Sequence, residues 1–213
     1  MRKQLNITTK CTRELSDNKR QYALAAGLFL LGILIGSIAA ITSKRADSAE
    51  MKAYFDRFLS AYPLQGAARS EIFQISMLNY LRLAALMWIA GWFVWLLPLG
   101  ALQVGIKGFR TGFTVAYLLR CYQLRGILLA VISILPQNLI LIPALCFFMV
   151  YQIKFAADRR HLRGVGAGSA LKRQVYGHNL AMTGVFLALL LICALIEGYI
   201  VPTMLQPVCG LFI

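Results

Sequence analysis

Four long stretches of the chain contain no charged residue, and they limit what the chain can fold into. They cover residues 21–43, 83–106, 126–153 and 174–196. Each is long enough for a helix that crosses a hydrocarbon core of about 30 Å. Helices of a soluble bundle would need a polar face that recurs about every 3.6 residues, and these stretches are apolar on all sides. The sequence therefore predicts an all-α integral membrane protein surrounded by lipid.

The basic residues flank the uncharged stretches, and their placement predicts how the chain is oriented. The net charge is +14, but Lys and Arg do not line one helix face, so we expect no nucleic-acid partner. Lys and Arg near the ends of a span favour the cytoplasmic side. They are dense in residues 2–20 and again in residues 154–173. We therefore expect both segments in the cytoplasm, the C-terminal tail outside the cell membrane, and an odd number of crossings.

These spans predict the order of segments along the chain. The apolar run of residues 22–42 exceeds the about 7–15 residues of a cleavable signal peptide, so we expect a retained anchor. The expected fold has about five transmembrane helices, some broken or re-entrant, and a short extracytoplasmic helical segment. The segments are a cytoplasmic basic N-terminus (1–21), the anchor (22–42), an extracytoplasmic amphipathic segment (43–82), a transmembrane core with broken helices (83–157), a cytoplasmic basic loop (158–177), the last transmembrane helix (178–200) and an extracytoplasmic tail (201–213).

Two prolines are expected to break the helices in the middle of the chain. Pro136 and Pro143 lack an amide N–H, and each disfavours helix at the residue before it. We predict the second crossing at residues 83–102, followed by two bent passes within residues 105–155. Three full crossings combined with re-entrant hairpins are the alternative.

Four polar residues in or beside the apolar stretches are candidate functional residues. A charged side chain in hydrocarbon costs at least about 2.5 kcal/mol on insertion scales. We expect Arg82 and Glu197 near the outer boundary, where Glu197 either pairs with Arg82 or reaches the headgroups alone. Gln137 and Asn138 follow Pro136, and their amides either satisfy the backbone at the expected break or line a polar site.

The extracytoplasmic segment contains aromatic and aliphatic side chains among its charges. Phe55, Phe58 and Leu59 share one helical face, and Tyr62 follows them. Such a face indicates either a helix that lies on the bilayer surface or a docking surface for an external partner. These four residues are the candidate partner-binding residues.

Residues for catalysis or metal binding are not found at the required spacings. His161 and His178 have no Cys, Asp or Glu at ligand spacing, and the five cysteines form no paired pattern. We therefore expect no enzyme activity, no metal and no cofactor. Small residues, among them Gly32 and Gly36, allow helices to approach closely. Because that spacing is also a weak dimerisation signal, the protein could also form a homo-oligomer.

Three motifs resemble one known family. They are GFRTGFTVAYLL at residues 108–119, ISILPQNLILIPAL at residues 132–145 and IEGYIVP at residues 196–202. Together with the anchor and the outer segment, they resemble the stage II sporulation protein M family of endospore-forming bacteria. The wider family commonly has His-Gly at the position of Gln137 and Asn138, followed by a Glu. No role of that His and Glu is carried over, because this chain lacks both.

The resemblance implies a role in sporulation. It implies a multi-pass protein of the mother-cell membrane at the sporulation septum and engulfing membrane. There the protein would be a scaffold in engulfment, in a complex with the peptidoglycan-remodelling stage II sporulation proteins D and P. The rival from another class is a transporter or permease subunit, because transporters build substrate sites at broken helices. A membrane-embedded enzyme is disfavoured, since no catalytic group of residues is present.

Overall fold

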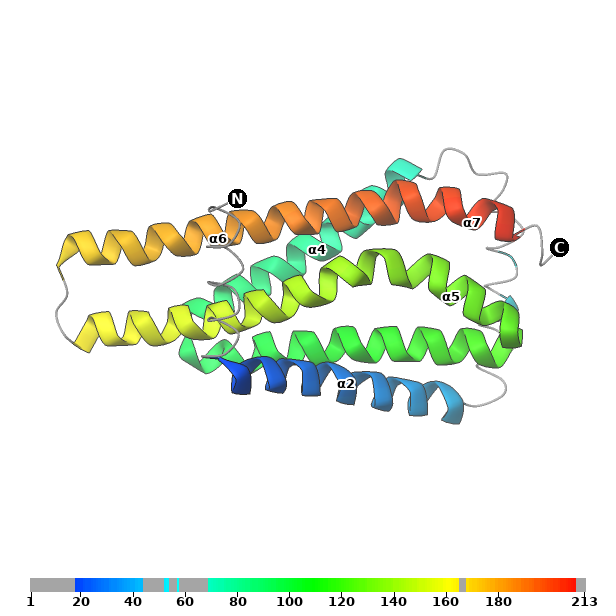
Figure 1. Cartoon of the computed structure of the whole chain (residues 1–213), viewed down its shortest axis with the longest axis horizontal. Helices are drawn as coiled ribbons and strands as arrows, with labels where there is room; N and C mark the ends of the chain where they lie inside the picture. Colours follow the sequence, from blue (N-terminus) through cyan, green and yellow to red (C-terminus); the bar gives the residue numbers. More distant parts are fainter. Residues whose placement is uncertain (1–17, 44–51, 54–56, 58–68, 165–167, 210–213) are drawn as a thin grey trace, which may run out of the picture.

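The described part of the chain is almost entirely helical. The computed structural model describes residues 18–43, 52–53, 57, 69–164 and 168–209, and these residues contain no strand. The helices are α2 (Lys19–Thr42), α4 (Arg69–Trp92), the 3-10 helix η2 (Val94–Leu96), α5 (Leu97–Gly164), α6 (Ser169–Leu195), the π-helix η3 (Ile196–Ile200) and α7 (Val201–Cys209). They run roughly along one long axis, with α4 crossing the others obliquely (Figure 1). The predicted all-α class is confirmed.

The helix α5 folds back on itself at Gln123. Its backbone is helical everywhere except at Gln123, where φ is 52° and ψ is −129°. The first arm (97–122) and the second arm (124–164) therefore lie antiparallel (Figure 1). Gly126 lets the arms meet closely, since a Cβ there would lie 2.6 Å from the carbonyl carbon of Leu118.

The predicted break at Pro136 to Asn138 is therefore wrong. The second arm stays helical through Pro136 and Pro143. Proline is tolerated inside a helix of a packed bundle, because neighbouring side chains can satisfy the freed backbone groups. The reversal occurs instead thirteen residues earlier, in a sequence without proline.

The predicted second crossing at residues 83–102 is also wrong. α4 begins at Arg69 and ends at Trp92, and Phe93 is extended with φ −122° and ψ 111°. The chain turns there, in the middle of an uncharged stretch, so hydropathy does not reveal the turn. Pro98 lies in the first turn of α5, a position that tolerates proline because the missing N–H would have no helical partner there.

Within the part of the chain that the structure describes, four helices are long and apolar enough to cross a membrane. They are Lys19–Thr42, Arg69–Trp92, Val94–Leu162 and Ser169–Leu205. The third includes both arms of α5, so the count of five crossings stays a prediction. The segment 158–177, expected as a loop, is mostly helical, because α5 continues to Gly164 and α6 begins at Ser169.

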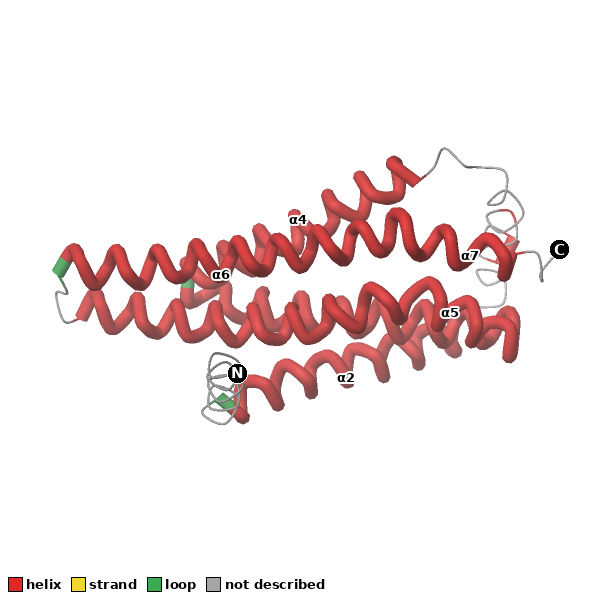
Figure 2. The backbone as a smooth tube through the Cα atoms, turned by 45° about the horizontal axis from the view of Figure 1, so that its top comes forward, coloured by secondary structure: helices red, strands yellow, loops and turns green. Residues whose placement is uncertain are grey.

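Two ends of the bundle can be distinguished. At the hairpin end lie the start of α2, the end of α4, the end of α5 and the start of α6; at the Gln123 end lie the end of α2, the start of α4 and α7 (Figure 1). The second arm of α5 and the start of α6 project together beyond α2 and α4 in both views (Figure 2). The basic residues Lys154, Arg160, Lys172 and Arg173 belong to this projecting hairpin.

Close glycine contacts fix α2 against the first arm of α5. A Cβ on Gly32 would lie 2.9 Å from the amide nitrogen of Phe109, and a Cβ on Gly36 would lie 2.9 Å from that of Phe113. From the other side, a Cβ on Gly112 would lie 2.7 Å from the Cα of Ile33. Real Cβ atoms essentially never approach so closely, so the prediction that these glycines allow close helix packing is confirmed.

An aromatic cluster holds the hairpin end together. The ring of Trp92 stacks on Tyr176 of α6 at 5.6 Å and meets Phe155 of α5 edge-on at 5.7 Å. The guanidinium of Arg159 lies 5.3 Å from the Trp92 ring centre and donates a hydrogen bond to the Trp92 backbone carbonyl. These contacts join the end of α4 to both helices of the projecting hairpin.

Candidate functional site

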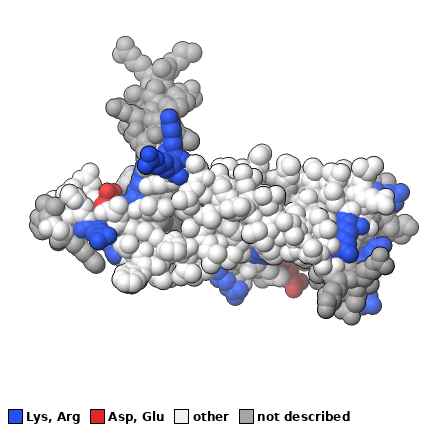
Figure 3. Space-filling model, turned by 90° about the horizontal axis from the view of Figure 1, so that it is seen from below, with Lys and Arg blue, Asp and Glu red and all other residues white. Residues whose placement is uncertain are grey.

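A polar cavity lies between α4, the first arm of α5 and η3. Its volume is about 240 Å³. Ten of its lining residues come from α4 and α5, and Glu197 comes from η3. The charged lining residues are Arg82, Lys107, Arg110 and Glu197. The uncharged polar lining residues are Ser76, Asn79, Tyr80 and Gln103. In Figure 3 most Lys and Arg side chains gather toward the two ends of the molecule, and a smaller group of charges lies beside the otherwise uncharged middle.

Helical periodicity brings these side chains onto facing surfaces. Gln103, Lys107 and Arg110 are separated by four and three residues, so they share one face of the first arm of α5. Ser76, Tyr80 and Leu83 are spaced by four and three residues along α4 in the same way. The two faces meet across the cavity.

A short π-helix presents Glu197 to this cavity. Gly198 packs against Phe73, since a Cβ there would lie 2.7 Å from the Cβ of Phe73. This close approach brings η3 onto α4, where the hydroxyl of Tyr80 donates a 2.7 Å hydrogen bond to Oε2 of Glu197. Tyr80 is 6% exposed. Single π-helical turns within longer helices are frequent at functional sites.

The basic residues of the cavity lie well inside their helices. At a rise of about 1.5 Å per residue, Lys107 is about 15 Å from the start of α5 at Leu97 and about 24 Å from Gln123. Arg82 is about 15 Å from the end of α4 at Trp92. Ionisable groups within membrane-spanning helices are costly in hydrocarbon and usually face a bundle interior or a cavity, where they mark functional sites.

The structure brings together two of the four polar residues singled out from the sequence. Arg82 and Glu197 line the same cavity, but among the described residues no ion pair joins them, and Glu197 accepts its hydrogen bond from Tyr80. Their pairing stays a prediction. Sequence reasoning missed Tyr80, Lys107 and Arg110 as site residues. The spacing of Lys107 and Arg110 on one face of an apolar segment was the available signal.

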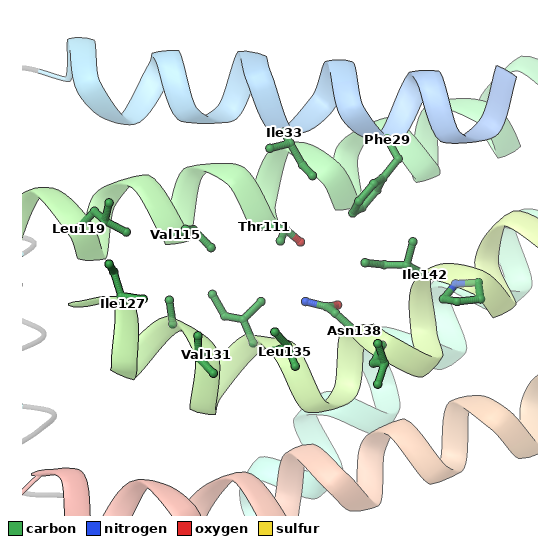
Figure 4. A pocket seen from close by; sticks show the side chains of 14 residues that line it. Phe29, Ile33, Thr111, Val115, Leu119, Ile127, Val131, Leu135, Asn138 and Ile142 are labelled. Atoms are coloured by element: carbon green, nitrogen blue, oxygen red, sulfur yellow. The ribbon is translucent and has the colours of Figure 1, made fainter. Parts of the chain in front are cut away.

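Gln137 and Asn138 lie apart from the polar cavity. Both are buried on the second arm of α5, at 7% and 5% exposure. Within the described chain, the side-chain oxygens of both residues have no hydrogen-bond partner. Asn138 points into a second, apolar cavity of about 540 Å³ between α2 and the two arms of α5 (Figure 4). Because the helix is unbroken here, these amides do not cap a helix end.

The remaining sequence predictions concern other parts of the chain. The candidate partner-binding residues Phe55, Phe58, Leu59 and Tyr62 lie outside the described residues, so their role stays a prediction. In the described ranges, His, Cys, Asp and Glu do not form any group of three or more that could hold a metal ion.

The chain was compared with known families, curated proteins and solved structures. No match was found among curated proteins or among solved structures. The family model described as stage II sporulation protein M matches residues 25–202, a range that includes every residue lining the two cavities. The match covers most of the chain, so the chain belongs to the stage II sporulation protein M family.

Proposed function

We propose that this protein is a membrane scaffold subunit of the sporulation engulfment complex. The observation that carries this proposal is the family match over residues 25–202. Membership of this family suggests a sporulation-related membrane protein. In the proposal, the protein anchors peptidoglycan-degrading partners, stage II sporulation proteins D and P, at the mother-cell membrane.

The bundle supports this role because it provides a firmly packed anchor. Gly36 and Gly112 hold α2 tightly against α5, and the aromatic cluster around Trp92 holds α4 against the projecting hairpin. The first basic residues of α2, Lys19 and Arg20, lie at the same end as the basic hairpin (Figure 1). Under the positive-inside bias this end faces the cytoplasm, and the Gln123 end faces the peptidoglycan side.

Crosslinking from the segment between α2 and α4 tests the scaffold role. A photo-crosslinking amino acid at Phe58 in sporulating cells should capture stage II sporulation protein D or P. The matched control places the same amino acid at Leu139, which is 71% exposed on the second arm of α5 and should meet lipid. If the Phe58 variant supports engulfment yet captures neither protein, that docking surface is wrong. If deletion of the gene leaves engulfment intact, the scaffold proposal itself fails.

A permease-like subunit is the second candidate, and the polar cavity favours it. Transporters place polar binding sites near the middle of the bilayer, and Lys107 and Glu197 line a polar cavity between otherwise apolar helices. A photo-crosslinker at Arg173, on the projecting hairpin, distinguishes the two functions. Capture of an ATPase would favour transport, whereas capture of protein D or P from position 58 would favour the scaffold.

A further inference from the structure

The polar cavity has more positive than negative charge. Arg82, Lys107 and Arg110 supply three positive charges and Glu197 supplies one negative charge, so two positive charges are in excess. Glu197 already accepts the hydrogen bond of Tyr80. Within the described ranges, the three cationic side chains form no hydrogen bond or ion pair. Lys107 does experience the field of Glu197.

This excess charge lies on helices that are apolar over most of their length. Lys107 is half-buried, whereas Arg82 and Arg110 are exposed on the surface of helices that would face lipid in a membrane. Ionised groups in such surroundings are normally paired with a counter-charge or bound to a ligand. An anion bound in the cavity would therefore neutralise charge that the lining residues do not neutralise among themselves.

The shape and donors of the cavity fit a small oxyanion. Arginine presents a planar fork of N–H donors that matches phosphate oxygens in pairs. Arg82 lines the cavity from α4, and Lys107 and Arg110 line it from α5, together with the amides of Asn79 and Gln103. The volume of about 240 Å³ is below the about 300–1,000 Å³ of pockets for drug-sized ligands, which suits a single small group.

We propose that the cavity formed by Arg82, Lys107 and Arg110 binds a phosphate group, carried by a lipid headgroup or by free inorganic phosphate. The phosphate would bridge α4 and the first arm of α5, beside the Tyr80–Glu197 hydrogen bond that joins α4 to η3. The proposal goes beyond the scaffold function, which requires no ligand at this position.

Thermal unfolding of the purified full chain in an uncharged detergent tests the proposal. Inorganic phosphate is titrated at constant ionic strength in one series, and short-chain phosphatidylglycerol in another. Diacylglycerol with the same acyl chains is the control without phosphate. Because a ligand that binds the folded state raises the melting temperature, one of the two phosphate sources should give a saturable rise that diacylglycerol does not. A rise with phosphatidylglycerol alone assigns a lipid headgroup, and a rise with inorganic phosphate assigns the free ion.

Charge variants test whether the binding occurs in this cavity. Arg110→Gln should weaken the apparent affinity at least about ten-fold, since it removes a charged donor. Glu197→Gln should instead tighten binding, because it removes the negative charge facing the anion. Arg173→Gln makes the same charge change on the projecting hairpin and should leave the affinity unchanged. If Arg110→Gln does not fold, Arg82→Gln on the facing helix replaces it.

Two outcomes would overturn the proposal. One is the absence of saturable stabilisation by either phosphate source. The other is stabilisation that Arg110→Gln and Arg173→Gln reduce equally, because that would reflect general attraction of anions to a basic protein. Engulfment can be scored in cells with the same variants, so failure of the phosphate site leaves the test of the scaffold function intact.

Discussion

Replacement of Gly36 by alanine tests how far the bundle depends on close packing between α2 and α5. A Cβ at this position would lie 2.9 Å from the amide nitrogen of Phe113 and 2.9 Å from the carbonyl carbon of Phe109. Ordinary contacts begin near 3.4 Å, and the carbonyl oxygen of Phe109 would lie closer still than these two atoms, so the two helices must separate by more than about 0.5 Å. The added atom meets backbone, which cannot rotate away as a side chain could.

The expected loss of stability follows from that separation. A gap of about 0.5–1 Å forfeits roughly a quarter to a half of the dispersion energy between facing atoms, and overpacking typically costs about 1–3 kcal/mol. Alanine regains up to about 1 kcal/mol through its higher helix propensity. The net destabilisation should be about 1–2 kcal/mol, which corresponds to a fall in melting temperature of about 2–8 °C for a chain of this size.

Melting in mild detergent, followed by tryptophan fluorescence, measures this loss. Gly27→Ala is the matched control, because Gly27 lies on the same helix and a Cβ there would meet no atom of the other described helices within 4 Å. The control should be as stable as the parent protein or slightly more stable. If Gly36→Ala melts no lower than Gly27→Ala, the close contact between α2 and α5 does not exist in the folded protein.

Three further predictions concern the site, the turn and the aromatic cluster. Tyr80→Phe removes the hydrogen-bond donor to Glu197 and should destabilise the protein by about 1.5–3 kcal/mol in the same melting assay. Glu197→Gln should cost less stability, because its amide oxygen still accepts the hydrogen bond, and equal losses of stability in the two variants would contradict this account. Gln123→Gly should melt no lower than the parent and Gln123→Val should melt lower, since φ is 52° there; a stable valine variant would argue against the turn. Trp92→Leu removes ring stacking and a cation–π contact and should cost about 1–3 kcal/mol, while Trp95→Leu, at a 94% exposed position, should change stability little.

Apolar composition was enough to predict the class of the protein. A crossing helix needs about 20 apolar residues in a row, and that requirement can be read from the chain without knowing its neighbours. The helix α2 (Lys19–Thr42) accordingly lies where the sequence placed the first crossing. The family resemblance was also visible in motifs such as residues 132–145, and the family match confirms it.

Turns and sites depended on tertiary structure. The turn at Phe93 falls inside an uncharged stretch, and the reversal at Gln123 has no proline, so neither left a clear local signal. Pro136, which does carry such a signal, remains within a helix because the helix is packed on its neighbours. Tyr80 and Glu197 are 117 residues apart in the sequence, and the packing of η3 on α4 brings them within hydrogen-bond distance.

The glycines also show what the sequence can predict and what only the tertiary structure determines. Sequence alone indicated that Gly32 and Gly36 allow a helix to approach closely, because a residue without a Cβ exposes its backbone. It did not indicate which helix approaches, since spacing along one helix contains no information about its partner. The tertiary structure shows that the partner is the first arm of α5 in the same chain, where Gly108 and Gly112 face α2 in return.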